Sequence, residues 1–562
     1  MPEIVERPVD EAARARLVAG GCDPRLARLF AARGLASMDE LATTLHALAP
    51  PETLSHVRDA AVLLADAIAR REKLLVVADY DADGATACAV AVKALRAMGA
   101  LVDYIVPNRA EHGYGITPEI VDEAAARKPG VLITVDNGIA ALEGIAHANA
   151  LGMRVLVTDH HLPGAELPAA ACIVNPNQSG CGFPSKSLAG VGVVFYVMLA
   201  LRAELRTRGA FASRPEPNLA DVLDLVALGT VADVVKLDAN NRILVSQGLA
   251  RIRAGKAAPG IIALFEVAGR STRAATAFDL AYSVGPRLNA AGRLDDMSLG
   301  IECLLAADAA RAMELAIRLD RLNRERREIE AQMQESALAL LDGIRPDGDY
   351  TLCVHHPEWH GGVVGILASR LKDRFHRPVF AFASDRDGRL KGSGRSIAGL
   401  HLRDALDVMA KRNATLLERF GGHAGAAGAT IAAASLAQFR AAFEAVARET
   451  LTPADLSLTI ETDGALAPHE IDLDLARMLK RCVWGQGFPE PRFAGRFAVE
   501  SQRVVGEKHV KAVLSLDGGR RFGAIRFGNA EPLAATIDAV YRLEVDEFHG
   551  EASVQLVLEH TR

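Results

Sequence analysis

Short apolar runs and longer alanine-rich stretches alternate through the first half of the chain. The interval between successive runs leaves room for one helix. The runs of β-forming residues lie at 74–77, 101–106, 131–135 and 155–157. This rhythm predicts βαβ units in a parallel sheet. We therefore expect a parallel-sheet α/β domain over residues 55–310, after a short helical segment at 1–54.

The hydrophobic spacing changes after residue 310. Between 311 and 342, apolar residues recur every three or four positions around a strongly charged middle, which predicts a long amphipathic helix linking two lobes. Residues 343–452 return to an α/β pattern. Strands are expected near 350–354 and 379–382, and Gly-rich loops at 360–362, 392–395 and 421–428.

The last part of the chain, residues 453–562, alternates like β-structure. Residues 503–516 and 520–527 resemble the two arms of a hairpin around a turn at 517–519, and strands are also expected at 540–545 and 553–558. An all-β barrel such as an OB-fold suits this length. The predicted fold class is thus α/β, with a parallel-sheet core, a linker helix, a second α/β lobe and a C-terminal OB-like domain.

Composition narrows the class of protein without naming its substrate. The 562 residues are too many for one core, and a hydrophobic fraction of 50% fits a globular chain. We find no apolar run that could span a bilayer and no signal peptide, so we expect no membrane partner and a cytoplasmic location. Seven scattered cysteines fit free thiols in a reducing compartment. The net charge of −6 does not exclude a nucleic-acid partner, because a local groove can be basic.

Acidic residues and histidines gather at the ends of the predicted strands. They are Asp79, Asp81 and Asp83 in ADYDADG, Asp136 in VDNG and the triplet Asp159-His160-His161, with Asp233 in GTVAD as a fourth cluster. Active sites of open α/β sheets lie at the carboxyl ends of strands. Carboxylates and imidazoles together suit Mn²⁺, or two divalent ions side by side. The sequence therefore predicts a metal site.

Other roles are open for each residue taken singly. One Asp at a strand end is more often the N-cap of the next helix, and a lone histidine is more often packed than ligating. The three acids of ADYDADG are more than helix capping needs. While this segment stays extended, their carboxylates share one side of the chain. We expect the following helix to begin near Ala85. Adjacent side chains of an extended chain point in opposite directions, so His160 and His161 should have different roles.

The motifs DYDADG, VDNG, DHH and GTVAD, in this order, resemble those of the DHH phosphoesterase superfamily. Further motifs resemble the RecJ family within it, whose members are single-strand-specific 5′→3′ exonucleases. These motifs are PNR at 107–109, GYG at 113–115, GPRLNAAGR at 285–293, HGGVVG at 360–365 and GSGRS at 392–396. The resemblance runs from about residue 70 to the C-terminus. It implies a DHHA1 domain at 343–452 and a nucleic-acid-binding domain at 453–562.

The resemblance also implies a division of roles within the cluster. It places two Mn²⁺ or Mg²⁺ ions on Asp81, Asp83, Asp136, His160 and Asp233. The resemblance also makes Asp79 a supporting residue. It assigns catalysis to Asp136, Asp159 and His161, with His161 at the scissile phosphate. Asp159 also orients the ligands. Two-metal hydrolysis would then release 5′-mononucleotides in DNA repair and recombination.

Two further sets of residues are candidates for contacts with nucleic acid or phosphate. Glycines let backbone amides approach phosphate closely, and arginine can bind it bidentately. The first set is Arg109, Tyr114, Arg287, Asn289, Arg293, His360, Ser393, Arg395 and His423; the second, in the β domain, is Lys508, Lys511, Arg520, Arg521 and Arg526. Packing or solvation remains an alternative for each of them.

Two other functions are weighed against a single-stranded-DNA exonuclease. A phosphohydrolase for short oligonucleotides or small phosphoesters would need only the two lobes, so the β domain argues against it. A non-catalytic scaffold would lack ligands, whereas every acidic motif is complete. The expected partners are single-stranded DNA, a single-strand-binding protein and a helicase, with the chain acting as a monomer. The 5′→3′ polarity rests on the resemblance alone.

Overall fold

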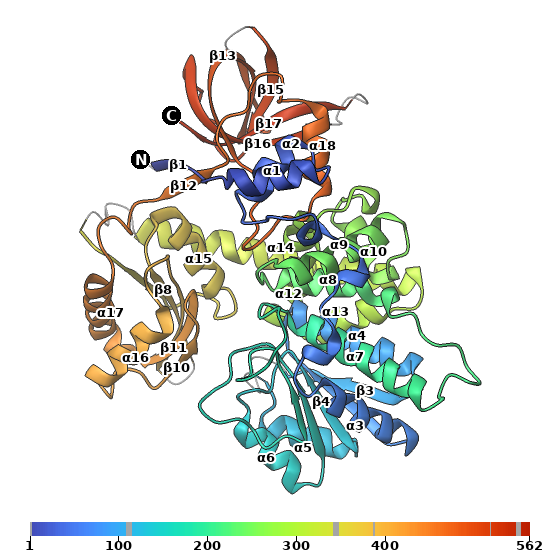
Figure 1. Cartoon of the computed structure of the whole chain (residues 1–562). Coiled ribbons are helices and arrows are strands. Elements are labelled where there is room, and N and C mark those ends of the chain that lie inside the picture. Colours follow the sequence, from blue (N-terminus) through green and yellow to red (C-terminus); the bar gives the residue numbers. More distant parts are fainter. Residues whose placement is uncertain (1–2, 108–114, 341–347, 386–387, 517–518, 547–551) are drawn as a thin grey trace. The chain divides into compact units, whose positions relative to one another are not determined.

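The computed structural model describes residues 3–107, 115–340, 348–385, 388–516, 519–546 and 552–562 (Figure 1). The chain forms two compact units. One unit comprises Met1–Val5 and Arg321–Ile460, and the other comprises Glu6–Asp320 and Glu461–Arg562. Among the described helices, none has the length and apolar character needed to cross a bilayer.

A five-stranded parallel sheet is the centre of the larger unit, in the order β3-β2-β4-β5-β6. Its strands are β2 (Lys73–Ala78), β3 (Leu101–Ile105), β4 (Val131–Val135), β5 (Arg154–Thr158) and β6 (Cys172–Val174). The four predicted strands are confirmed. The fifth, β6, has only three residues, too few for a recognisable apolar run.

Helices cover both faces of this sheet (Figure 1). The helices α3 (Val57–Ala69), α4 (Ala82–Ala97) and α7 (Gly190–Thr207) pack together on one face, and α5 (Pro118–Ala126) and α6 (Leu142–Ala150) on the other. On the side of α5 and α6, alternate strand residues such as Leu75 and Val77 are fully buried. Because both faces are covered, the strand interiors are apolar and polar chemistry is left to the strand ends.

A set of helices follows the sheet and completes this part of the unit. It comprises α8 (Leu223–Ala232), α9 (Ala239–Arg253), α10 (Pro259–Val267), α11 (Ala277–Asp279), a π-helical segment (Leu280–Val284), α12 (Gly285–Leu294), α13 (Ser298–Leu305) and the start of α14 (Ala309–Leu340). Helix α8 packs against α4 and α9. The predicted linker helix is confirmed, since α14 lies within two residues of its expected bounds at both ends.

The smaller unit contains a mixed sheet in the order β10-β11-β9-β8-β7. Its elements are β7 (Leu352–His356), α15 (Val364–Phe375), β8 (Val379–Ser384), β9 (Arg389–Arg395), α16 (Leu402–Arg412), β10 (Arg419–Gly422), β11 (Ala426–Ala432) and α17 (Leu436–Thr450). The two expected strands correspond to β7 and β8. Only these two pair in parallel, while the Gly-rich strands pair antiparallel.

Two segments predicted as Gly-rich loops are instead strands. Residues 392–395 lie in β9, and residues 421–428 form the end of β10, a turn and the start of β11. A Cβ at Gly392 would lie 2.3 Å from the ring of Phe382, and one at Gly394 would lie 2.5 Å from the ring of Phe380. These glycines make room for a buried aromatic core, which a pattern of hydrophobic positions does not reveal.

The C-terminal strands form a closed barrel in the order β13-β14-β15-β17-β16, as expected for an OB-fold. They are β13 (Phe493–Val505), β14 (His509–Ser515), β15 (Arg521–Arg526), β16 (Thr536–Asp546) and β17 (Ser553–Thr561). The single strand predicted at 503–516 is wrong. A turn at 506–508 separates β13 from β14, and both Gly506 and Glu507 adopt positive φ, at 57° and 60°. Residues 517–518 of the expected turn lie outside the described residues.

The N-terminal helices α1 (Glu11–Ala19) and α2 (Pro24–Ala31) belong with the barrel. Leu29 of α2 lies in one hydrophobic core with barrel residues and with α18 (Leu473–Arg481). Just after α2, the Arg33 guanidinium lies 2.8 Å from the Asp463 carboxylate, and both side chains are buried. This ion pair joins two segments that are 430 residues apart along the chain.

Candidate functional site

The predicted ligands converge at the carboxyl edge of the parallel sheet. Three overlapping groups each bring their ligand atoms within 4.8 Å of one another. The groups are Asp136 with His160 and His161, Asp83 with His160 and Asp233, and Asp79 with Asp81 and Asp136. The five expected ligands therefore belong to one cluster, with Asp79 and His161 beside them.

The ADYDADG segment turns into helix α4 earlier than expected. Helix α4 begins at Ala82, and Asp81 is its N-cap, accepting hydrogen bonds from the N–H groups of Asp83 at 2.9 Å and Gly84 at 3.0 Å. The expectation of three carboxylates on one side of an extended chain is therefore wrong, because Asp83 lies in the first helical turn. A Cβ at Gly84 would lie 2.6 Å from the Asp79 carbonyl oxygen, so glycine is required by close packing.

Asp83 is held by the N-terminus of helix α7, a contact that the sequence interpretation missed. The Asp83 carboxylate accepts hydrogen bonds from the N–H of Gly190 at 2.7 Å and that of Val191 at 2.9 Å. The first N–H groups of a helix lack partners within it and favour negative charge. A Cβ at Gly190 would lie 2.6 Å from that of Asp136. The glycines at the start of this apolar helix, in GVGVV, were the sequence signal from which the close approach could have been predicted.

Asp136 follows β4 in a left-handed conformation, with φ at 63°. Its N–H donates to the Thr158 carbonyl at 3.0 Å, which extends the pairing of β4 with β5. The next side chain, Asn137, donates to the carbonyls of Val77 at 3.2 Å and Val135 at 2.9 Å, and so ties the ends of β2 and β4 together. A non-glycine residue persists at positive φ only where its surroundings fix it, and such residues concentrate at active sites.

Asp159 organises the segment that carries the two histidines. One carboxylate oxygen accepts from the N–H of Ile139 at 2.9 Å, and the other accepts from the N–H of His160 at 2.7 Å. The second oxygen also lies 2.8 Å from Nδ1 of His161. Asn175 donates to the His161 carbonyl at 2.9 Å. Asp159 thus contacts backbone and His161, the geometry of a supporting residue.

The two histidines occupy different environments. The side chain of His160 is 12% exposed, whereas that of His161 is 47% exposed. Burial, assisted by the charge of His161, lowers the pKa of His160 to about 4, so His160 is neutral with a lone pair available for a metal. Burial opposes protonation of His161 as well, but its hydrogen bond to Asp159 raises the pKa to about 9.

The cluster has the properties of a site for divalent cations. Nε2 of His160 lies 3.1 Å from Oδ1 of Asp136 and 3.5 Å from Oδ2 of Asp233. Within the described part of the chain, neither His160 Nε2 nor Asp233 Oδ2 has a hydrogen-bond partner, although both atoms are buried. Such atoms are costly unless something else satisfies them. Oxygen and imidazole nitrogen ligands fit Mn²⁺, and the oxygens also fit Mg²⁺.

Electrostatics within the cluster support the same conclusion. Burial, followed by the charge of Asp83, raises the pKa of Asp136 well above its usual value. Burial and the charge of Asp81 raise the pKa of Asp83 to about 7. The carboxylates therefore repel one another in a site shielded from water. Bound cations would remove that repulsion, so the residues present fit the metals that the sequence predicted.

Helix α12, which carries the GPRLNAAGR motif, packs on the metal-binding loop. Asn289 Oδ1 accepts from the N–H of Ala82 at 2.8 Å, and a Cβ at Gly292 would lie only 1.8 Å from the Tyr80 carbonyl oxygen. Arg287 is paired with Asp320 of α14 at 2.8 Å. Asn289 was predicted to contact phosphate, but its side-chain oxygen is used inside the protein. Arg293 lies in the last turn of the same helix.

Two candidates of the smaller unit, Ser393 and Arg395, lie beside the start of α15. A Cβ built at Gly365, in the first turn of α15, would lie 3.0 Å from Oγ of Ser393 and 3.1 Å from Nη2 of Arg395. Nδ1 of His360, just before α15, accepts from the N–H of Gly362 at 3.1 Å. His423 lies in the turn between β10 and β11. An arginine beside a helix N-terminus is a setting for phosphate. Arg109 and Tyr114 lie outside the described residues.

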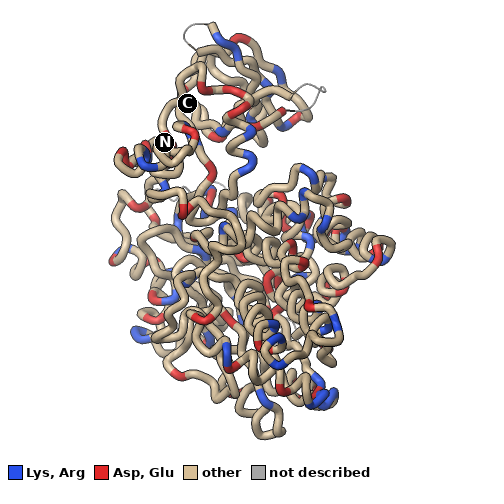
Figure 2. Tube along the Cα trace, turned by 45° about the vertical axis from the view of Figure 1, so that its right-hand side comes forward, with Lys and Arg blue, Asp and Glu red and all other residues tan. Residues whose placement is uncertain are grey.

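The basic candidates of the barrel are mostly engaged with the protein. Arg526 is 9% exposed and donates to Oγ1 of Thr561 at 3.2 Å. It occupies an inward position of its strand, which faces the barrel interior, and this argues against a contact with DNA. Arg521 lies 2.6 Å from a Glu500 oxygen, and Arg520 donates to a backbone carbonyl. Lys511 lies 3.5 Å from Asp546, and Lys508 lies in the turn after β13. Figure 2 shows acidic and basic positions interspersed over the barrel.

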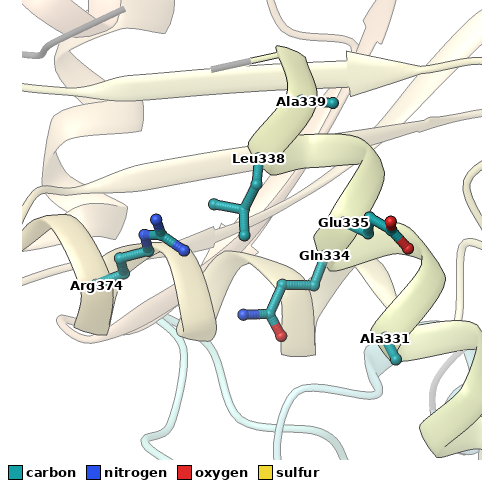
Figure 3. Close-up of a pocket in the computed structure, with 6 residues that line it drawn as sticks. All are labelled: Ala331, Gln334, Glu335, Leu338, Ala339 and Arg374. Atoms are coloured by element: carbon teal, nitrogen blue, oxygen red, sulfur yellow. The ribbon is translucent and has the colours of Figure 1, made fainter. Parts of the chain in front are cut away.

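A surface hollow in the smaller unit is unrelated to the acidic cluster. Its lining comes from α14 and α15, with side chains of both helices around it (Figure 3). The lining residues are Ala331, Gln334, Glu335, Leu338, Ala339 and Arg374. None of them is a predicted ligand or phosphate contact, so the hollow does not change the assignment of the site.

Three family models match separate parts of the chain. Residues 73–230 match the DHH family, N-terminal domain, residues 348–449 match the DHHA1 domain, and residues 462–560 match the RecJ OB domain. The first match contains all the residues of the cluster except Asp233. The third covers the barrel.

Relatives match over nearly the whole chain. It is 52% identical over 549 residues to a single-stranded-DNA-specific exonuclease RecJ of Dickeya dadantii, covering 95% of each chain. It also resembles crystal structures of RecJ from Thermus thermophilus in complex with Mn²⁺ and with Mg²⁺. The Mn²⁺ complex gives a TM-score of 0.83 at 31% identity, covering 100% of this chain and 79% of that one. The Mg²⁺ complex gives a TM-score of 0.78 at 29% identity, covering 100% of this chain and 78% of that one.

Proposed function

Because the chain belongs to the RecJ family of single-stranded-DNA-specific exonucleases, we propose that it removes 5′-mononucleotides from the 5′ end of single-stranded DNA at its acidic cluster. The observation that carries this proposal is the convergence of Asp, His and Asp ligand atoms from four separate segments at one sheet edge. The family supplies the class of substrate, and the geometry supplies the place of hydrolysis.

Asp81, Asp83, Asp136, His160 and Asp233 would hold two divalent cations, Mn²⁺ or Mg²⁺. When bound, such ions neutralise phosphodiester charge, lower the pKa of a water that attacks phosphorus and stabilise the leaving oxygen. The protein's own contribution is to fix the ligands. Asp83 is fixed by the first amides of α7, and Asp136 by the pairing of β4 with β5.

His161 is proposed to bind the scissile phosphate. Its Nδ1 lies 2.8 Å from the Asp159 carboxylate, which fixes the ring and leaves Nε2 for the substrate. The ring lies beside His160, with 4.5 Å between the ring centroids, and remains half-exposed. A residue that is held on one side and open on the other suits contact with a substrate. Asp159 acts through His161 and the backbone N–H groups that it holds, and Asp79 acts through the loop before Asp81, because its carboxylate accepts from the Tyr80 N–H at 2.7 Å.

Backbone phosphates of the strand would be bound by several of the remaining candidates. Arg395 and Ser393, beside the start of α15, have the geometry of a phosphate site. Arg109, Tyr114, His360, His423, Arg293 and Lys508 remain candidates for such contacts. The barrel, which matches the RecJ OB domain, favours a polymer over the alternative substrates, short oligonucleotides or small phosphoesters.

The wider role follows the family. We propose that the enzyme acts in DNA repair and recombination in the cytoplasm, as a monomer, on strands exposed by a helicase or coated by a single-strand-binding protein. Size-exclusion chromatography with light scattering would test the monomer, and a dimeric mass would contradict it. Pull-down from a lysate treated with nuclease would test the protein partners.

The activity is tested with oligonucleotides labelled at either end. We expect labelled mononucleotide from a 5′-labelled single strand with Mn²⁺ or Mg²⁺, no product with chelator, and little product from a blunt duplex. A 3′-labelled strand should release its label only at the end of digestion. Early release of the 3′ label would contradict the polarity, and faster cleavage of a dinucleotide than of a long strand would favour the small-substrate alternative.

A further inference from the structure

Two exposed aromatic side chains lie next to each other on the larger unit. Phe278 and Tyr282 are 50% and 70% exposed, and their ring centroids are 4.6 Å apart at an angle of 34°. In the described part of residues 6–320, no other Phe, Tyr or Trp side chain is exposed to this degree. Folding favours the burial of aromatic surface, so an exposed pair needs another explanation.

This aromatic pair is connected to the acidic cluster through the helix that follows. Tyr282 lies three residues, about one turn, before Gly285, where a built Cβ would lie 3.1 Å from Cβ of Ala232. Ala232 directly precedes the ligand Asp233. The next residue, Val234, is 62% exposed with φ at 61°, a strained conformation for a β-branched residue. An exposed apolar side chain therefore lies directly after the ligand Asp233.

The backbone around Tyr282 is also unusual. Residues Leu280–Val284 form a π-helical segment between α11 and α12. Such segments are rare and occur frequently at functional sites. Further along the same helix, Asn289 accepts a hydrogen bond from the metal-binding loop at Ala82. One continuous helix therefore links the exposed rings to two of the segments that supply metal ligands.

We propose that Phe278 and Tyr282 form a stacking platform for a base of the bound single strand, close to the scissile bond. The proposal rests on the proposed function, because a single strand presents unpaired base faces near the cluster. Two rings already in contact need little ordering, and the exposed ring of Tyr282 offers a face to a base. Since every base has a π-face, the platform should be tolerant of sequence.

The test combines enzyme variants with modified substrates. KM is measured for Tyr282→Ala, Phe278→Ala and Tyr282→Phe on a 5′-labelled single strand. The strand is either intact or carries one abasic residue, placed in turn at each of the first positions from the 5′ end. Leu101→Ala is the matched control, because Leu101 is 57% exposed at the amino end of β3, away from the carboxyl edge. Thermal unfolding verifies that each variant is folded.

We expect Tyr282→Ala to raise KM about tenfold, the equivalent of ~1.4 kcal/mol, which lies within the range for base stacking. Tyr282→Phe and Leu101→Ala should stay close to wild type. One abasic position should raise the wild-type KM by a similar factor and have no further effect in Tyr282→Ala.

An unchanged KM in Tyr282→Ala would overturn the platform, and so would abasic effects that are the same in wild type and Tyr282→Ala at every position. Failure of wild type to degrade the intact strand would instead refute the proposed function.

Discussion

Substitution of Gly292 by alanine adds one methyl group where helix α12 meets the metal-binding loop. The new Cβ would lie 1.8 Å from the Tyr80 carbonyl oxygen and 3.0 Å from its carbon. The obstacle is backbone, so it cannot rotate away as a side chain would. Either α12 or the loop must move, and Tyr80 stands between Asp79 and Asp81 of the cluster.

The size of this movement sets the expected effect. Relief of the overlap requires a shift of roughly 1 Å, and a misplacement of that order can cost about 100-fold in rate. Overpacking costs ~1–3 kcal/mol of stability, and the better helix propensity of alanine offsets ~1 kcal/mol of it. We therefore expect kcat to fall about 100-fold while the free energy of unfolding falls by at most about 2 kcal/mol.

The assay is Mn²⁺-dependent release of nucleotide from a saturating labelled single strand, together with thermal unfolding. Gly300→Ala in α13 is the matched control. Its Cβ would meet Sδ of Met297 at 2.9 Å and Cδ2 of Leu288 at 3.3 Å, which belong to side chains and not to the backbone of the metal-binding loop. Gly300→Ala should keep wild-type kcat. If Gly292→Ala also kept kcat within about threefold of wild type, α12 would not control the loop geometry.

Three further predictions follow from other parts of the structure. His161→Gln should lower kcat about 100-fold or more, while calorimetry should show unchanged Mn²⁺ binding. Loss of Mn²⁺ binding with retained kcat would instead make His161 a metal ligand and not a phosphate contact. Asp463→Ala leaves the buried Arg33 guanidinium without its main partner and should lower the free energy of unfolding by ~3–5 kcal/mol. An unchanged denaturation midpoint would show that this ion pair does not hold α2 to the barrel. Affinity for single strands should fall about tenfold or more between roughly 50 and 200 mM salt, and a flat dependence would argue against phosphate contacts.

The strands and the metal cluster could be predicted because their signals are local. An apolar run such as Val131–Val135 followed by Asp136 combines a buried strand with an acid at its carboxyl end. Because carboxyl ends of parallel strands meet at one edge, convergence of the acids follows from topology. Asp233 is different, since it ends helix α8, and only the resemblance to known motifs placed it with the others.

The missed features depend on packing between distant segments. Gly392 and Gly394 lie in strand β9, where the absence of a Cβ leaves room for the phenylalanine rings behind them. Asn289 resembles a phosphate contact in sequence, yet its oxygen is bound to the N–H of Ala82, 207 residues away. Arg526 alternates with exposed residues but faces inward. No periodicity of a single segment carries this information.

In the function that we propose, the acidic cluster holds the divalent cations that assist the hydrolysis of DNA. This role is tested most directly by the rate of nucleotide release from a 5′-labelled single strand by Asp136→Asn over a full Mn²⁺ titration. Loss of a shared ligand removes several kcal/mol of charge stabilisation, so we expect a fall of about 10³-fold that added Mn²⁺ does not restore. A rate within about tenfold of wild type would contradict the assignment of Asp136 as a metal ligand of the catalytic site.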